Sequence, residues 1–270
     1  MSKTIVITGS TDGIGKLAAI KLAKEGHHIY LHGRNAEKLN KVITEIKELS
    51  ANENIKGYVA DFSDLEAVQQ MGQQINKDLS KIDVLINNAG IFKSVDSKNK
   101  QGLDIRLVVN YFAPYILTNA LLPLLKNGTT PRLINLSSAA QAPVSNEALT
   151  GSMELGVQEA YAQSKLALTM WSFHLAKVLS TIGVIAVNPG SLLDTNMVRE
   201  AYGKFWSPAA KGGNIIYDLA ISEEYEGVTG KYFDNDKGDV KGHFGEAHPD
   251  AYNTIKIDQL IKITKSIIRA

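Results

Sequence analysis

Two kinds of segment alternate along the chain. Short apolar runs rich in β-branched residues are followed by longer segments in which apolar and charged residues recur with the period of a helix. The short runs predict strands over residues 3–8, 28–32, 56–60, 82–86, 132–136, 183–187 and 231–234. The longer segments predict helices from the turn after the first strand to Gly26, and over residues 36–49, 64–79, 102–126, 157–180, 208–221 and 254–268.

This order of strands and helices predicts an α/β fold. A helix after each strand carries the chain back across the sheet, so the strands run parallel and helices cover both faces of a doubly wound sheet. No Pro/Ser/Gly-rich linker or charge run divides the sequence, so we expect a single domain over residues 1–270. Ligands of such sheets bind at the carboxyl ends of the strands.

The first strand leads into a glycine-rich turn. Residues 9–15 read Gly-Ser-Thr-Asp-Gly-Ile-Gly, and glycines allow both a sharp reversal and the close approach of a ligand to the backbone. The next helix begins with unpaired N–H groups and the positive end of its dipole, which suit a phosphate or pyrophosphate. Taken alone, the turn is also compatible with a tight connection that binds nothing, because its spacing is not the Gly-x-Gly-x-x-Gly fingerprint.

Small and polar residues follow the other predicted strands as well. They are Gly33-Arg34-Asn35, Asp61-Phe62, Asn87-Asn88-Ala89-Gly90, Ser137-Ser138 and Asn188-Pro189-Gly190. Each group alone could be a turn. Together they predict one crevice with a polar rim, which a purely structural account does not require.

Composition narrows the class of ligand. The chain has 29 basic and 28 acidic residues, so it lacks the charge excess expected of a protein that binds nucleic acid or acidic membranes. It has no cysteine and its N-terminus enters a strand rather than a signal peptide, so we expect a cytoplasmic protein. Residues 107–125 are long and apolar enough to suggest a membrane span, but Asn110, Pro114 and Asn119 interrupt them, and we interpret them as a buried or interface helix. The expected partner is a small molecule, with neither nucleic acid nor membrane.

The short motifs of this sequence, taken in their order along the chain, closely resemble those of the short-chain dehydrogenase/reductase family, which has a Rossmann-type sheet. The resemblance is strong from Lys3 to about Gly190 and looser beyond. It is carried by Thr8-Gly9-Ser10-Thr11-Asp12-Gly13-Ile14-Gly15, Asp61, Asn87-Asn88-Ala89-Gly90, Asn110, Ser138, Tyr161-Ala162-Gln163-Ser164-Lys165 and Asn188-Pro189-Gly190. The long interval from Ser138 to Tyr161 is similar to that of the retinol-dehydrogenase-like and polyketide-ketoreductase-like branches.

The resemblance implies a nicotinamide cofactor and a catalytic set of four residues, Asn110, Ser138, Tyr161 and Lys165. Together with the strand ends, it places the cofactor against Gly9, Ser10, Thr11, Asp12, Gly13, Ile14, Gly15, His32, Arg34, Asn35, Asp61, Phe62, Asn88, Ala89, Gly90, Tyr161, Lys165, Pro189, Gly190 and Thr195. No metal is expected.

The spacing of Tyr161 and Lys165 has a chemical meaning of its own. Residues four apart share one face of a helix, so the ammonium can lie near both the phenol and a ribose. A proton donor useful near neutrality needs a tyrosine pKa about two to three units below its usual value of about 10, and Lys165 with an oxidised nicotinamide is the expected cause. Ser138, preferred over the neighbouring Ser137 on family alignment, is expected to bind the substrate oxygen, and Asn110 to hold a water that returns protons to Lys165.

A second Tyr-x-x-x-Lys occurs at Tyr252 to Lys256, past the last predicted strand. No serine-bearing strand end precedes it in the right order, so we assign it to the surface. His243 and His248 lie in a Gly-rich loop without a convincing third ligand, so we do not expect a metal site there.

The end of the second strand predicts which cofactor is used. Strands of this kind that serve NAD usually end in an acidic residue that binds the ribose hydroxyls. Here Gly33 stands in that region, and Arg34, with His32 nearby, offers a cation for a 2′-phosphate, so NADP(H) is favoured over NAD(H). The alternatives are that Arg34 is a solvated turn residue or stacks on adenine, and Asp12 stands where some NADP-using relatives have a basic residue.

These observations predict an NADP(H)-dependent oxidoreductase that reduces a bulky apolar ketone or aldehyde. The alternatives are a dehydrogenase of a lipophilic alcohol such as a retinoid or steroid, and a regulatory protein that senses NADP(H) without turnover. A mobile substrate loop is expected at about residues 191–206, where Leu192, Leu193, Met197, Phe205 and Trp206 gather. The helices over residues 107–125 and 161–179, the latter with Met170, Trp171 and Phe173, resemble those through which family members pair, so we expect a homo-oligomer, a dimer or a tetramer.

Overall fold

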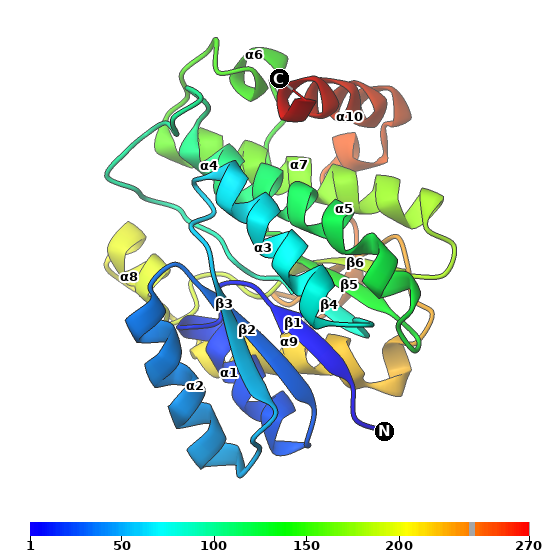
Figure 1. The fold of residues 1–270 in the computed structure, drawn as a ribbon. Coiled ribbons are helices and arrows are strands. Elements are labelled where there is room, and N and C mark those ends of the chain that lie inside the picture. The colour runs from blue at the N-terminus through cyan, green and yellow to red at the C-terminus, as the bar shows by residue number, and fades with distance from the viewer. Residues whose placement is uncertain (238–240, 270) are drawn as a thin grey trace.

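The computed structural model describes residues 1–237 and 241–269 and has one central sheet between two layers of helices (Figure 1). Within those ranges, eight strands lie in the order β3-β2-β1-β4-β5-β6-β7-β8. They are β1 Thr4–Ile7, β2 His28–Gly33, β3 Ile55–Val59, β4 Val84–Asn87, β5 Arg132–Leu136, β6 Gly183–Asn188, β7 Lys231–Asp234 and β8 His243–Gly245. All neighbours from β3 to β7 are parallel, and β8 is antiparallel to β7. The predicted doubly wound α/β domain is confirmed.

Helices cover both faces of the sheet. They are α1 Gly13–Lys24, α2 Ala36–Ser50, α3 Leu65–Asp78, α4 Ile105–Leu107, α5 Ala113–Lys126, α6 Asn146–Leu149, α7 Val157–Val178, α8 Asn196–Tyr202, α9 Ala209–Ile221 and α10 Thr254–Arg269. A π-helical turn η1, Val108–Phe112, and the 3₁₀ turns η2, Glu223–Tyr225, and η3, Pro249–Tyr252, complete the set. In Figure 1, α1, α2 and α9 lie below the sheet, and α3, α5 and α7 lie above it.

The strands build a core on each side because successive side chains of a strand point to opposite faces. Ile5 and Ile7 of β1 pack in the core shared with α1, α2 and α9, whereas Val6 between them packs in the core shared with α3, α5 and α7. Strand β4 divides in the same way, with Val84 and Ile86 on one side and Leu85 on the other. Strands buried on both faces read as continuous apolar runs, which explains why they are recognisable in the sequence.

The predicted helix over residues 102–126 is interrupted. It begins at Ile105, because the Asp104 carboxylate caps it by accepting a hydrogen bond from the N–H of Arg106 at 2.8 Å. The π-helical turn η1 then separates α4 from α5. Such turns are rare and often lie at functional sites. This one contains Asn110.

Besides the 3₁₀ turns η2 and η3, three short elements were not predicted. Helix α8 lies inside the stretch expected to be irregular, α6 lies between β5 and α7, and β8 lies at the edge of the sheet with His243 in it. Because α8 has seven residues and buries none of them, it has no apolar face that a periodicity could reveal.

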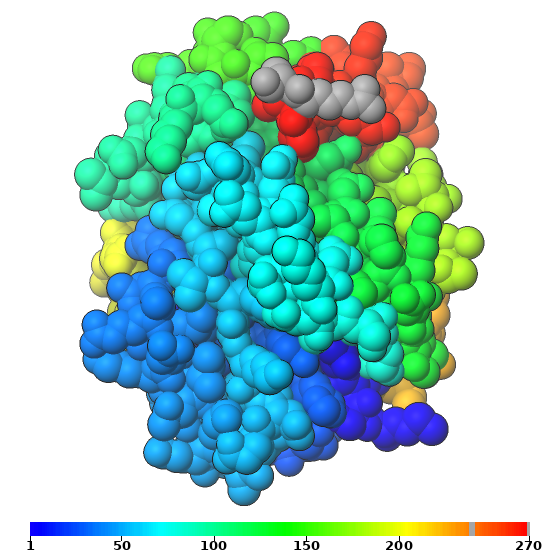
Figure 2. All heavy atoms as spheres, viewed as in Figure 1, coloured from blue at the N-terminus to red at the C-terminus, as the bar shows by residue number. Residues whose placement is uncertain are grey.

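Helix α10 packs against α7 on the side away from the sheet. The hydroxyl of Tyr111 in η1 and that of Thr264 in α10 are hydrogen-bonded at 2.7 Å, and both residues are fully buried. In Figure 2 the red atoms of α10 lie next to the green atoms of the helices beside them. Met170, Trp171 and Phe173 are therefore buried within one chain and do not form an open pairing face. Homo-oligomerisation stays a prediction.

One described helical stretch, Ile105–Lys126, is long and apolar enough by composition to cross a membrane, with a mean hydropathy of 1.4. However, 72% of its most apolar window is buried inside the protein, as in the core helix of a globular domain. The expectation of a buried helix is confirmed.

Candidate active site

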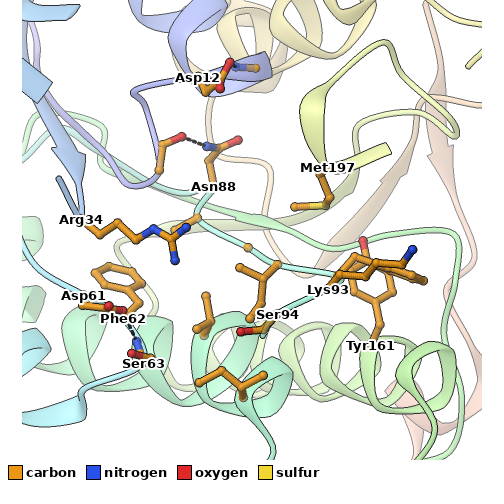
Figure 3. Close-up of a pocket in the computed structure, with 18 of the residues that line it drawn as sticks. Asp12, Arg34, Asp61, Phe62, Ser63, Asn88, Lys93, Ser94, Tyr161 and Met197 are labelled. Carbon is orange, nitrogen blue, oxygen red and sulfur yellow. Dashed lines mark hydrogen bonds between the residues drawn. The ribbon is translucent and has the colours of Figure 1, made fainter. Parts of the chain in front are cut away.

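A cavity of about 1260 Å³ lies at the carboxyl ends of the strands, where the sequence predicts a crevice. The glycine-rich turn after β1 and the ends of β2 to β6 line it, and residues 91–101 and α8 close its outer side (Figure 3). All the predicted strand ends therefore contribute to one site.

The glycine-rich turn is shaped for a close contact with the segment after β4. Gly9 and Gly13 have φ values of +61° and +54°, in the left-handed region that favours glycine. A Cβ on Gly9 would lie 2.6 Å from the Cα of Ala89, and one on Gly15 would lie 2.3 Å from Nδ2 of Asn88. Asn88 Nδ2 in turn donates hydrogen bonds to the carbonyl oxygens of Thr8 at 2.9 Å and Gly9 at 2.8 Å, which fixes the turn (Figure 3).

The end of β2 presents Arg34 to the cavity. In Figure 3 its side chain extends into the space beside Phe62. Across residues 1–237 and 241–269, no hydrogen bond or ion pair engages its guanidinium. A side chain on Gly33 would lie 2.5 Å from Cγ2 of Thr11, so the turn packs directly against this strand end. The side chain of Asn35 caps α2 by accepting a hydrogen bond from the N–H of Lys38, so it is not directed into the cavity.

His32 connects the turn to β3. Its Nδ1 accepts a hydrogen bond from the N–H of Gly9 at 3.0 Å, and its Nε2 lies 3.0 Å from the carbonyl oxygen of Ala60, so Nε2 carries the proton. Burial lowers the pKa of His32 to about 4, although the bond to Ala60 and the charge of Asp61 act in the opposite direction. The ring is therefore neutral and stacks on Phe62 at 4.2 Å. The His32 ring therefore positions the backbone of Gly9 and Ala60, and it offers no positive charge to a phosphate.

Lys165 and Tyr161 lie on one face of α7, as their spacing predicts. Lys165 Nζ donates to the carbonyl oxygen of Leu136 at 2.8 Å and lies 5.6 Å from the centroid of the Tyr161 ring. Burial lowers the pKa of Lys165 to about 8. Burial also raises the pKa of Tyr161 to about 12, because the opposing effect of the Ser138 hydroxyl is smaller. The expected lowering of the tyrosine pKa is thus not a property of the protein alone.

Asn110 lies beside Lys165. Its Oδ1 accepts from the N–H of Ile91 at 2.8 Å, and its Nδ2 donates to the carbonyl oxygen of Ile91 and to Oγ of Ser164. A Cβ on Gly90 would lie 3.2 Å from Asn110 Oδ1 and 3.3 Å from Lys165 Nζ. The missing side chain at position 90 therefore leaves room for both groups in one small space.

The two adjacent serines after β5 have different environments. Ser137 is buried, and its hydroxyl bonds to Thr169 Oγ1 at 2.6 Å and to the carbonyl oxygen of Lys165 at 3.2 Å. The Ser138 hydroxyl interacts with Tyr161. The carbonyl oxygen of Ser138 accepts from Tyr232 Oη at 3.0 Å and from Gln141 Nε2 at 2.9 Å, so its backbone is held from two sides. This geometry favours Ser138 as the residue that faces a substrate.

The segment after β6 reaches the cavity through Pro189, Gly190 and Thr195. Asn188 Nδ2 donates to Asp234 Oδ1 and Asp236 Oδ2, which holds the end of β6 against the segment after β7. Thr195 caps α8, since its hydroxyl accepts from the N–H of Val198. At the end of β3, Asp61 and Phe62 line the opposite side of the cavity.

Sequence reasoning missed an aromatic wall beside Tyr161. The ring of Phe92 lies 5.0 Å from that of Tyr161 and 5.3 Å from that of Tyr202 in α8. Lys93 Nζ donates to the carbonyl oxygen of Glu200 at 2.9 Å and so joins the same two segments. The one signal available was that Phe92 comes two residues after the Asn-Asn-Ala-Gly motif.

The residues assigned to the surface lie away from the cavity lining. The Tyr252 hydroxyl accepts from the N–H of Ala247, and Lys256 pairs with Asp250. Within the described residues, no group of three or more His, Cys, Asp or Glu side chains could hold a metal ion, and this includes His243 and His248.

Comparison with known proteins identifies the family. The sequence model of the short chain dehydrogenase family matches residues 3–204. Retinol dehydrogenase 13 of Mus musculus is 32% identical over 252 residues, which cover 86% of this chain and 75% of that protein. Polyprenol dehydrogenase of Homo sapiens is 31% identical over 257 residues, which cover 87% and 77%. The chain belongs to the short-chain dehydrogenase family and is an oxidoreductase of that family.

Solved structures agree with the fold. A short chain dehydrogenase from Shigella flexneri complexed with NADP superposes with a TM-score of 0.70 at 28% identity, covering 86% of this chain and 96% of that chain. A protein from Mycobacterium paratuberculosis has a TM-score of 0.79 over 99% of this chain and 94% of its own, at 23% identity, and shows the fold alone.

Proposed function

We propose that this protein is an NADP(H)-dependent reductase of bulky apolar ketones or aldehydes. The observation that carries the proposal is that two sets of residues face one cavity. One set is the glycine-rich turn with Arg34, and the other is Tyr161 with Ser138. Lys165 and Asn110 lie directly behind the second set. A nucleotide and a reacting carbonyl therefore fit in the same space.

The cavity is large enough for a dinucleotide. Its volume of about 1260 Å³ exceeds what a small carbonyl compound alone requires. The glycines at positions 9, 15 and 33 remove side chains that would collide with neighbouring atoms at the turn. The N-terminus of α1 faces this space and favours a pyrophosphate. When bound, the nicotinamide cofactor supplies or accepts a hydride.

Four protein residues bind the substrate oxygen, supply its proton and hold the groups that do so. Ser138 donates a hydrogen bond to the substrate oxygen, and Tyr161 gives its phenolic proton to that oxygen during reduction. Lys165 contributes positive charge beneath the tyrosine ring, at 5.6 Å from its centroid. Asn110 fixes residue 91 next to Lys165 through both of its amide atoms. Because the protein alone leaves the pKa of Tyr161 near 12, this residue is protonated at neutral pH and ready to act as the acid.

The cofactor preference is assigned to Arg34. Its guanidinium faces the cavity without a protein partner among the described residues, as a group that binds an external anion would. Two solved relatives at 28% identity, from Shigella flexneri and Escherichia coli, were crystallised with NADP and NADPH. We expect the parent to prefer NADPH over NADH in kcat/KM, and Arg34→Leu to reduce that preference about 10-fold to 150-fold. A parent that prefers NADH, or an Arg34→Leu enzyme with an unchanged preference, contradicts this assignment.

The substrate class is assigned from the aromatic wall. Phe92 and Met197 line the cavity together with Tyr161, and Tyr202 packs on Phe92, which favours an apolar substrate. A screen of NADPH consumption over ketones, quinones, aldehydes and steroids tests this. Bulky apolar carbonyl compounds should give the highest kcat/KM, and faster turnover of small charged keto acids would overturn the assignment.

A second candidate function is the oxidation of a lipophilic alcohol. It is supported by the names of the curated relatives, retinol dehydrogenase and polyprenol dehydrogenase. The same screen run with NADP and long-chain or retinoid alcohols separates the two directions. A protein that binds NADPH but turns over neither class would instead support the non-catalytic sensor.

A further inference from the structure

Asp12 contacts three separate elements of the site. Its Oδ1 accepts from the N–H of Gly13 at 2.8 Å at the start of α1. Its Oδ2 accepts from Lys38 Nζ of α2 at 2.9 Å and from Asn196 Nδ2 of α8 at 2.7 Å. One carboxylate thus joins the glycine-rich turn, the helix after Arg34 and the helix over the substrate end of the cavity.

This contact matters because α8 has little buried surface. The structure describes all seven residues of α8 and buries none of them. Its far end is held by the bond from Lys93 to the carbonyl oxygen of Glu200 and by the packing of Tyr202 on Phe92. Arg199 contacts only the segments that flank the helix, through Asp194 and the ring of Phe205. An element with so little buried surface opens at low free-energy cost. Within the described residues, the bond from Asn196 is the side-chain hydrogen bond that ties the first turn of α8 to the glycine-rich turn.

The charge of Asp12 needs compensation in an NADP(H) site. Burial raises the pKa of Asp12, but the hydrogen bonds from Lys38, Gly13 and Asn196 and the positive charge of Lys38 together outweigh burial, and the net pKa is lowered. The residue is therefore a carboxylate at neutral pH, in the lining of the cavity that also contains Arg34. A bare carboxylate there would repel a 2′-phosphate, whereas one paired with Lys38 is neutralised locally.

We propose that Asp12 is a positioning residue that couples the two ends of the site. Its carboxylate holds α8 closed through Asn196, and Lys38 balances its charge next to the cofactor phosphate. The second part rests on the proposed function, and the first does not. Asp12 in this chain holds α8, which we call the lid, over the cavity. This role accounts for an acid at a position where a basic residue would suit NADP(H).

The lid is tested by trypsin, because Arg199 and Lys204 lie in and just after α8 and both are exposed. We expect Asn196→Asp to place two carboxylates together and to speed cleavage after both residues about three-fold to ten-fold, measured by mass spectrometry on the protein alone. Asp12→Asn in the Asn196→Asp background should restore the parent rate. Cleavage after the buried Lys165 monitors global unfolding, and Asn40→Ala, exposed on α2, is the matched control. An unchanged rate in Asn196→Asp, or no rescue in the double variant, overturns the lid role.

The charge balance is tested by fluorescence titration with NADPH and NADH. Lys38→Met should weaken NADPH binding at least three-fold more than NADH binding, and Asp12→Asn in that background should recover most of the loss. An equal loss for both cofactors, or a loss that Asp12→Asn does not rescue, overturns the balancing role. A parent that binds NADH more tightly than NADPH contradicts the proposed cofactor, while the trypsin result still decides the lid.

Discussion

The chain contains the pattern Tyr-x-x-x-Lys twice, and the structure gives the two copies opposite environments. In the first, Tyr161 and Lys165 lie on the 22-residue helix α7, which is continuous across both residues. Lys165 is buried, and its ammonium reaches a backbone carbonyl oxygen of β5 and the ring of its own tyrosine. Both groups therefore lie within one polar pocket of the core.

In the second copy, the helix is broken between the two residues. Tyr252 ends the 3₁₀ turn η3, and α10 begins at Thr254. The Tyr252 ring packs on Phe173, and Lys256 turns back to Asp250 at 2.7 Å. Both side chains are about half exposed. The comparison shows that the spacing has chemical meaning only on a continuous helix whose polar face is buried beside other reacting groups.

The largest expected difference between the copies is in turnover. Tyr161→Phe removes the proposed proton donor and should lower kcat by about 10³-fold, with NADPH affinity nearly unchanged. Tyr252→Phe should leave kcat within two-fold, roughly the scatter of a neutral surface change. Steady-state kinetics and NADPH titration of both variants measure this. An active Tyr161→Phe enzyme would contradict the proposal that Tyr161 is the proton donor.

The next difference is in stability. Burial lowers the folded-state pKa of Lys165 from 10.5 to about 8, so at pH 7 the buried ammonium costs about 3 kcal/mol. Lys165→Met removes that cost and leaves one carbonyl oxygen without its donor, about 1 kcal/mol. We expect the free energy of unfolding in urea to rise by about 2 kcal/mol while turnover is lost. Lys256→Met breaks a surface ion pair and should change stability by less than about 1 kcal/mol. A destabilised Lys165→Met protein would contradict the pKa assignment.

The pH profile separates the copies further. Lys165 is a cation below its pKa of about 8 and becomes neutral above it, whereas Tyr161 stays protonated throughout that range. The kcat/KM for reduction should therefore be flat below pH 8 and fall about ten-fold per pH unit above it. Lys256→Met should keep this profile. A rate that rises through pH 8 would show that neutral Lys165 is the active form.

The smallest expected effect is on the second tyrosine. Tyr252→Phe removes the hydroxyl that accepts from the N–H of Ala247 at 3.0 Å, at a partly exposed site, and should cost about 1 kcal/mol or less. Thermal unfolding measures it, with Tyr202→Phe as a comparison. A loss of several kcal/mol would mean that this copy has a structural role that its exposure does not indicate.

Those parts of the fold that depend on burial could be predicted from the sequence. Strands such as β1 and β4 are apolar on both faces and so stand out, and the motifs at their ends follow in a fixed order. The convergence of Asn110 and Lys165 beside Gly90 follows from that order. The cytoplasmic location and the oligomeric state stay predictions.

Other parts have no signal within a single sequence. Helix α8 buries nothing, and the three-residue β8 depends on pairing with β7 rather than on a pattern of its own. The sequence suggests that His32 assists a phosphate, but both ring nitrogens of His32 contact backbone groups instead. Those groups belong to segments 23 and 28 residues away in the sequence. Such contacts appear only when the chain is folded.

The position of α10 has a consequence for how the protein is made. The bond between Tyr111 and Thr264 joins residues 153 positions apart, so it is among the late contacts to form as the chain leaves the ribosome. Until α10 docks, α7 and the ring of Tyr111 lack the cover that this helix provides, and the apolar side chains there are open to aggregation. A chain released before Thr254 would carry Tyr161, Lys165 and the whole cavity lining, yet would present this surface to chaperones.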